Sequence, residues 1–154
     1  MKYHRKQILF NWYIKLISAF THADWRRFHE LLFDQVVEGW YFTVVGGDFS
    51  DLVLSNFPGK FLWFKSCNFS KTVFQGGVFF PTTFENCDLK NADFRFTSGY
   101  VDFINCDLRG VQFNETTKIY GLKDSTSTST ITDCLIDDEF KAHLRKRGVT
   151  FKTT

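Results

Sequence analysis

The sequence lacks the features that mark several large classes of protein. It contains no stretch of eighteen consecutive apolar residues, so no transmembrane helix is expected. Neither sign of charge is in excess, because 19 lysines and arginines stand against 17 aspartates and glutamates and give a formal net charge of +2. The chain is therefore neither a polyanion nor a polycation.

Enzyme motifs are also missing. We find no phosphate-binding glycine loop, no zinc-protease helix, no paired CxxC motif and no nucleophile elbow. His22 and His29 lie two turns apart in a predicted helix, but no matching carboxylate or thiol accompanies them as a metal ligand. We therefore expect no enzyme, and no catalytic, cofactor-binding or metal-binding residues.

The sequence does contain a period of five. From Asp48 to Phe113 a large apolar residue recurs at every fifth position, with one register slip between Phe94 and Phe103. A helix repeats every 3.6 residues and a strand every two, so neither keeps this spacing in phase over more than sixty residues. A chain that turns a corner every five residues does, and its recurring residues should form the core. These central residues are Phe49, Leu54, Gly59, Phe64, Phe69, Phe74, Phe79, Phe84, Leu89, Phe94, Phe103, Leu108 and Phe113.

A second column of small or modest residues lies two positions earlier and should also point inward. Cys67, Cys87 and Cys106 belong to it at spacings of 20 and 19, so they should stack on one face. We interpret them as small core residues with free thiols rather than as a metal or redox site, because cysteine behaves as a small buried hydrophobe. Cys134 lies outside the repeat and has no evident mate.

The quintets CDLKN at 87–91, ADFRF at 92–96 and CDLRG at 106–110 resemble the pentapeptide-repeat family. The resemblance covers residues 46–115 and implies a mainly β fold, a right-handed, four-sided parallel β-solenoid. A longer echo of twenty residues, visible in GGDFSD, SCNFSK, NCDLKN and NCDLRG, supports four sides independently. Thirteen repeats at four per coil predict about three coils.

Both ends of such a stack need caps, because open strand edges invite further pairing. Residues 1–45 are predicted to form an N-terminal αα-hairpin, with helices over 5–20 and 22–38. Residues 116–154 are predicted to form a Ser/Thr-rich surface loop over 122–132 and then a short capping helix, which begins at 137–139 and ends before Gly148. Phe140 and Leu144 should face the last coil. The predicted segments are thus 1–45, 46–115 and 116–154.

Five aromatic residues fall on positions that should point outward: Phe61, Trp63, Phe80, Phe96 and Tyr100. Phe61, Phe80 and Tyr100 recur at spacings of 19 and 20, which places them at about the same corner of consecutive coils. A contiguous aromatic patch is seldom left in water. Either the N-terminal helices cover this patch, or it is a docking site for another protein or a second copy of the chain.

The favoured functional hypothesis is a non-catalytic bacterial or phage protein–protein interaction module that presents its solenoid faces to an unidentified protein partner. The family resemblance implies an alternative, since some pentapeptide-repeat proteins look like duplex DNA and modulate or protect type II topoisomerases such as gyrase. Residues 46–115 carry only six basic and eight acidic groups, which argues against such mimicry. A secreted or membrane-surface effector is a second alternative.

The expected location is the cytoplasm. The N-terminus imitates a signal peptide, with a basic MKYHRK before an apolar run, but Asn11 and Lys15 interrupt that run. We expect no direct binding to nucleic acid and no membrane binding. A homodimer through an end cap is left open.

Overall fold

The computed structural model describes residue 27 and residues 42–120 and 129–154. The predicted helices over 5–20 and 22–38, and with them nearly all of the expected αα-hairpin, lie outside these residues.

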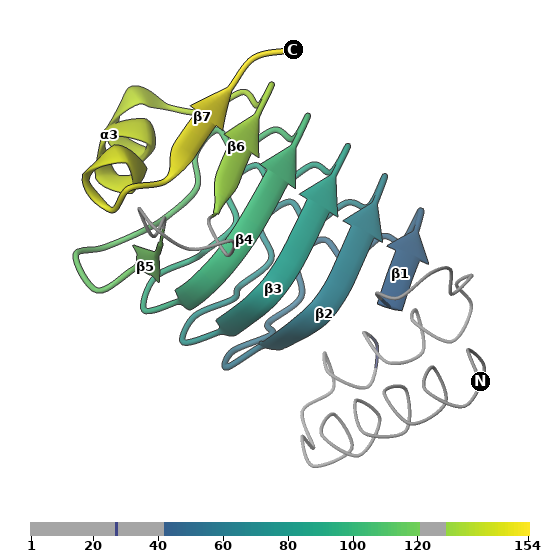
Figure 1. The fold of residues 1–154 in the computed structure, drawn as a ribbon. Helices are drawn as coiled ribbons and strands as arrows, with labels where there is room; N and C mark the ends of the chain where they lie inside the picture. The colour runs from purple at the N-terminus through teal and green to yellow at the C-terminus, as the bar shows by residue number, and fades with distance from the viewer. Residues whose placement is uncertain (1–26, 28–41, 121–128) are drawn as a thin grey trace, which may run out of the picture.

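The described chain is a parallel β-solenoid with one short helix (Figure 1). Its elements are β1 (Phe42–Val45), β2 (Pro58–Lys65), β3 (Val78–Glu85), β4 (Ser98–Ile104), β5 (Lys118–Ile119), β6 (Thr130–Thr132), α3 (Asp138–Lys146) and β7 (Thr150–Lys152). One sheet runs in the order β1-β2-β3-β4-β6-β7, with β5 paired to β4, and every pairing is parallel.

The stack is taller than predicted. Six strands follow one another along the main path of the sheet, so the chain makes about five turns rather than about three. The sheet begins at Phe42, before the predicted start of the repeat, and continues through β6 and β7 after its predicted end. The predicted surface loop over 122–132 is wrong at its C-terminal end, where residues 130–132 form β6.

Between residues 48 and 112 the coils repeat the same hydrogen-bonding pattern at the predicted spacing of about twenty. Asp48 bridges Asn68 and Val53 bridges Val73, and a strand of seven or eight residues then completes the coil. Backbone bonds such as Phe49 N to Asn68 O, at 2.7 Å, join consecutive coils. The right-handed winding and the four sides stay predictions.

The predicted core is confirmed. The central side chains from Phe49 to Leu108, and the small side chains of the second column, are buried, and only Phe113 at the end is half-buried. Rings of successive coils stack, as in Phe64 and Phe84, whose centroids lie 5.3 Å apart. Because each buried phenylalanine contributes roughly 1.5 to 3 kcal/mol, this stack supplies much of the driving force for folding.

Packing explains why Gly59 is the one central position without a large side chain. A Cβ at Gly59 would lie 2.6 Å from the Phe79 ring and 2.8 Å from Thr82 Oγ1. The space is taken by Phe57, which is fully buried in the second column and lies 5.6 Å from Phe79 between ring centroids. A large and a small residue have therefore exchanged columns in this coil.

The cysteine column has four members instead of three. Cys106 N donates a hydrogen bond to Cys134 Sγ at 3.3 Å, so Cys134 extends the column although it lies outside the predicted repeat. All four are free thiols, and Cys87 Sγ donates to the carbonyl oxygens of Phe64 and Glu85 at 3.4 and 3.3 Å. Contact with the neighbouring sulfurs, together with burial, raises the pKa of the Cys87 thiol far above its usual range. All four thiols thus donate to the coil backbone, and those of Cys67, Cys87 and Cys106 are buried.

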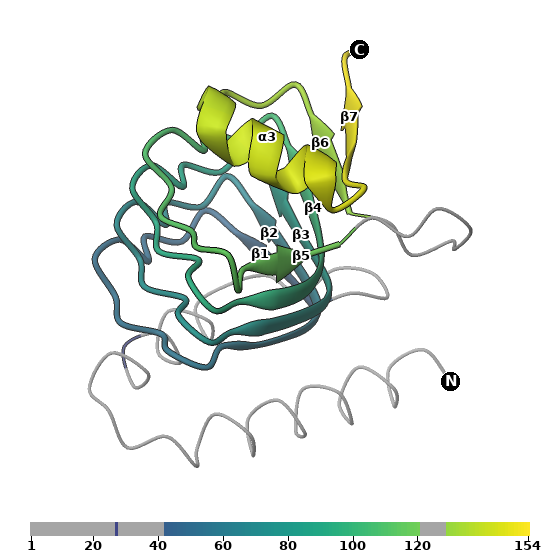
Figure 2. The same cartoon turned by 90° about the vertical axis from the view of Figure 1, so that its left-hand side faces the viewer.

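The C-terminal helix is confirmed and lies over the end of the stack (Figure 2). Phe140 and Leu144 are buried, as predicted, and the Phe140 ring lies 5.0 Å from that of Phe113. The carbonyl oxygen of Thr117 lies 2.9 Å from His143 Nε2 and accepts a hydrogen bond from Arg147 Nε at 2.7 Å. These polar contacts tie the helix to the last coil beside its apolar face.

Candidate interaction surface

A bulge between β3 and β4 shapes the outer face of the sheet. Phe79 pairs with Gly99 and Thr82 with Val101, so two residues of β3 stand opposite one residue of β4, Tyr100. Gly99 has φ +120°, and a Cβ there would lie 1.8 Å from the carbonyl oxygen of Phe79. Only glycine fits this close approach. The predicted register slip is therefore a bulge, a feature that redirects side chains.

The bulge carries a row of aromatic rings, Phe80, Tyr100 and Tyr120, which we call the aromatic ladder. The ring centroids of Phe80 and Tyr100 lie 5.6 Å apart in an edge-to-face arrangement, and those of Tyr100 and Tyr120 lie 6.4 Å apart. Phe80 is 48% exposed, and both tyrosines are half-buried. Val78, on the same face as Phe80, is also exposed. The ladder joins three coils on one outer face.

The sequence prediction does not include Tyr120, because the predicted repeat ends at residue 115. The register of β4 and β5, which pairs Ser98 with Lys118 and Gly99 with Ile119, brings Tyr120 next to Tyr100. The spacing of twenty residues between the two tyrosines is a signal that could have found it.

Phe61 is one residue out of register with Phe80. The residue of β2 that pairs with Phe80 is Lys60, so the coil spacing here is 20, one more than the spacing of Phe61 and Phe80 in the sequence. The side chain of Phe61 lies outside the described part of the chain.

Trp63 lies on β2 and is engaged within the chain. Its indole Nε1 donates a hydrogen bond to Glu85 Oε2 at 2.9 Å. Lys65 Nζ lies 4.4 Å from the centroid of the Trp63 ring and 3.8 Å from the same Glu85 oxygen. Trp63 is half-buried in this network. Glu85 already accepts the hydrogen bond of the indole group, so Trp63 is less available to a binding partner than the exposed rings are.

Phe96 occupies a corner of the coil and is 55% exposed. Its φ of +62° lies in the left-handed region, which bulky residues rarely adopt. The corresponding corners of the two preceding coils carry Asn56 and Gly76, residues that tolerate this conformation. Phe96 and Tyr100 are four residues apart, roughly 13 Å along an extended chain, and Val78 pairs with Ser98 between them.

Carboxylates on another outward column accept hydrogen bonds from the backbone of the turns. Asp88 and Asp107 each accept a hydrogen bond from the amide two residues further on, and Arg109 forms an ion pair with Asp107 at 2.6 Å. These hydrogen bonds from Arg109 hold the pKa of Asp107 below its usual value. Within residues 42–120 and 129–154 no group of three or more histidine, cysteine, aspartate or glutamate side chains could hold a metal ion. No helix in the described ranges is long and apolar enough to cross a membrane.

Two solved structures show a distant likeness to the chain. One trypsin-treated variant of QnrB1, described as a plasmid-mediated fluoroquinolone resistance protein, is 17% identical over 71% of this chain and 80% of its own, with a TM-score of 0.24. A second trypsin-treated QnrB1 variant is 16% identical over 68% and 85%, with a TM-score of 0.20. No protein-family model and no curated protein matches the chain. Similarities of this size carry no functional information.

Proposed function

We propose that the protein is a non-catalytic protein–protein interaction module that binds its partner through the outer face of the solenoid. The proposed contact is the aromatic surface, which we define as the aromatic ladder with Val78 and Phe96. The proposal includes membership of the pentapeptide-repeat family, a right-handed four-sided coil, and a cytoplasmic role in a bacterium or phage.

The observation that carries the proposal is the exposed side chain of Phe96 on a left-handed backbone. A non-glycine residue in the left-handed region costs roughly 1 to 2 kcal/mol, and a phenylalanine that is half exposed recovers only about 1 kcal/mol by burial. Asparagine or glycine would fill the corner without that cost, as Asn56 and Gly76 do in the preceding coils. A phenylalanine here gives the isolated chain no advantage, whereas bound to a partner it would bury its remaining half.

The aromatic ladder adds the anchors that interfaces prefer. Tyrosine and tryptophan are enriched among the residues that dominate binding energy, and packed rings lose little conformational entropy on binding. Phe80 and Tyr100 already hold each other in an edge-to-face pair, 5.6 Å apart. The surface is therefore both apolar and preorganised.

The charges give no support to mimicry of DNA. Carboxylates of the outward column have cations beside them: Asp107 pairs with Arg109 at 2.6 Å and Asp88 with Lys90 at 3.3 Å. Mimicry of duplex DNA requires a field that is negative over a long surface. A partner that recognises aromatic side chains fits the described face better.

The test compares Phe96→Asn with Lys71→Asn in the full chain. Lys71 has φ +59° and is exposed, so it provides the same backbone conformation at another corner, without an aromatic ring. We expect both variants to keep native circular dichroism and to stay within about 1 kcal/mol of the wild type in urea unfolding. Proteins recovered on immobilised wild type should also be recovered on Lys71→Asn and be lost on Phe96→Asn and on the double variant Phe80→Ser/Tyr100→Ser.

Identical recoveries on all four proteins would show that the aromatic surface is not the binding face. The remaining possibility is self-association of the chain, which light scattering after size-exclusion chromatography detects. A wild type of twice the monomer mass that becomes monomeric in Phe96→Asn would make a second copy of the chain the partner.

A further inference from the structure

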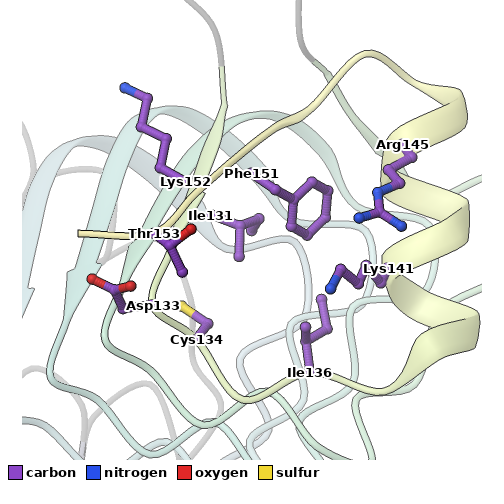
Figure 3. A pocket seen from close by; sticks show the side chains of 9 residues that line it. All are labelled: Ile131, Asp133, Cys134, Ile136, Lys141, Arg145, Phe151, Lys152 and Thr153. Carbon is purple, nitrogen blue, oxygen red and sulfur yellow. The ribbon is translucent and has the colours of Figure 1, made fainter.

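A pocket of about 300 Å³ opens beside α3 at the C-terminal end of the solenoid (Figure 3). Its apolar lining is formed by Ile131 of β6, Ile136 before α3, and the ring of Phe151 on β7, with Cys134 beside them. The volume lies at the lower end of the range for small-molecule sites, so the pocket suits a ligand of about one amino acid or one substituted ring.

Two cations of α3 reach into this pocket. Lys141 Nζ lies 5.7 Å and Arg145 Cζ 5.2 Å from the centroid of the Phe151 ring. Figure 3 shows both side chains directed from the helix toward that ring, whereas the Lys152 side chain points away. Being four residues apart on one helix, the two cations repel each other.

Neither cation is neutralised by the described chain. The ion pairs found among residues 42–120 and 129–154 involve other lysines and arginines. The acidic residue of the lining, Asp133, lies across the pocket from the helix and accepts hydrogen bonds from Thr154 N, at 3.1 Å, and from Thr154 Oγ1. Two positive charges therefore face Phe151 and the two isoleucines, and the carboxylate of Asp133 does not lie between them.

We propose that this pocket binds a small organic carboxylate with an apolar, ring-containing body. The carboxylate would lie between Lys141 and Arg145, whose guanidinium can hold both oxygens at once, and the body would pack on Phe151 and the two isoleucines. An anion there also relieves the repulsion along α3. The side chains of Ile131, Ile136 and Phe151 argue against a phosphate, which is strongly hydrated and is usually held by backbone amides.

The chemistry has two sources, a free small acid or the carboxyl end of a peptide chain. Both ligands present a carboxylate, and the experiment distinguishes between them. The pocket uses none of the residues of the aromatic surface, so its failure would leave the proposed function standing, and the reverse also holds.

The test is a titration of the full chain, labelled with ¹³C in the isoleucine methyl groups and followed by NMR. With 3-phenylpropionate as the probe, the signals of Ile131 and Ile136 should shift in a saturable way, while that of Ile119 in the core should not. A dissociation constant on the order of 1 to 10 mM is expected for a ligand of this size. The matched neutral probe, 3-phenylpropanol, should bind at least about tenfold more weakly, because it lacks the charge.

The variant Arg145→Gln should weaken 3-phenylpropionate binding by about tenfold, and Lys141→Gln should do the same. The control Arg109→Gln removes a cation that already has a carboxylate partner and should leave the affinity unchanged. Absence of saturable shifts, equal binding of the alcohol, or equal binding by Arg145→Gln in a natively folded protein would each overturn the proposal. Equal or tighter binding of phenyl phosphate would overturn the assignment to carboxylates.

Acetyl-Ala-Phe with a free carboxyl end, compared with its amide, separates the two sources. Binding of the acid form at least as tight as that of 3-phenylpropionate would identify a peptide end as the ligand. Binding of 3-phenylpropionate alone would identify a free small acid. Either result supports the proposed carboxylate site.

Discussion

Replacement of Gly99 by alanine should be among the most destabilising single changes in this chain. The glycine has φ +120°, a conformation that costs a residue with a side chain about 1 to 3 kcal/mol. In addition, the new Cβ would lie 1.8 Å from the carbonyl oxygen of Phe79, which is backbone and cannot rotate away. Separating β3 from β4 to relieve that clash costs about another 1 to 3 kcal/mol. We expect a loss of about 4 kcal/mol in the free energy of unfolding.

The measurement is equilibrium unfolding in urea, with Gly46→Ala as the matched control. Gly46 also has a positive φ, +75°, but a Cβ there would meet no atom within 4 Å. Its replacement should cost only about 1 kcal/mol, the backbone preference alone. A Gly99→Ala protein as stable as Gly46→Ala would refute the close approach of β3 and β4, and with it the bulge beneath the aromatic ladder.

Two further predictions concern polar groups. Thr82 Oγ1 is buried without a hydrogen-bond partner in the described structure, so Thr82→Val should stabilise the protein by about 1 kcal/mol. Thr72→Val loses a 2.7 Å hydrogen bond to a backbone carbonyl and should destabilise the protein by about the same amount. The midpoints of urea unfolding measure both changes, and equal effects of the two substitutions would show that Thr82 does not lack a hydrogen-bond partner. Hydrogen bonds from Arg109 lower the pKa of Asp107, so this carboxylate contributes stability at pH values above its ordinary pKa of 3.8, and the contribution is lost as the pH falls through the lower pKa of the folded state. Asp107→Asn should therefore lose less stability than the wild type between pH 6 and pH 2. Parallel curves of unfolding free energy against pH for the two proteins would contradict this prediction.

The inward residues were predictable because a five-residue period has one structural explanation. Phe69, Phe74 and Phe84 are fully buried, and the cysteine column follows the same logic. The number of turns was not predictable, because the period is interrupted. Cys106 and Cys134 are adjacent in the stack although 28 residues separate them in the sequence, whereas Cys87 and Cys106 are separated by 19.

The candidate surface was predictable only in part, because outward side chains obey no packing rule that the sequence reveals. The expected proximity of Phe80 and Tyr100 is confirmed, because a spacing of twenty residues in the sequence corresponds to one coil. The role of Trp63 depends on Glu85, a partner 22 residues away whose side chain could have pointed elsewhere. The unusual backbone of Phe96 became visible only with its φ angle.

The interruption between Cys106 and Cys134 has a practical meaning for protein engineering. The ladder pairs Ile104 with Thr132 across 28 residues and then returns to a step of twenty, pairing Thr132 with Lys152. The winding therefore absorbs extra chain at one place and resumes its phase. A binding peptide or a fluorescent reporter grafted between residues 120 and 129 should leave the sheet on either side intact, which offers a way to decorate this scaffold without redesigning it.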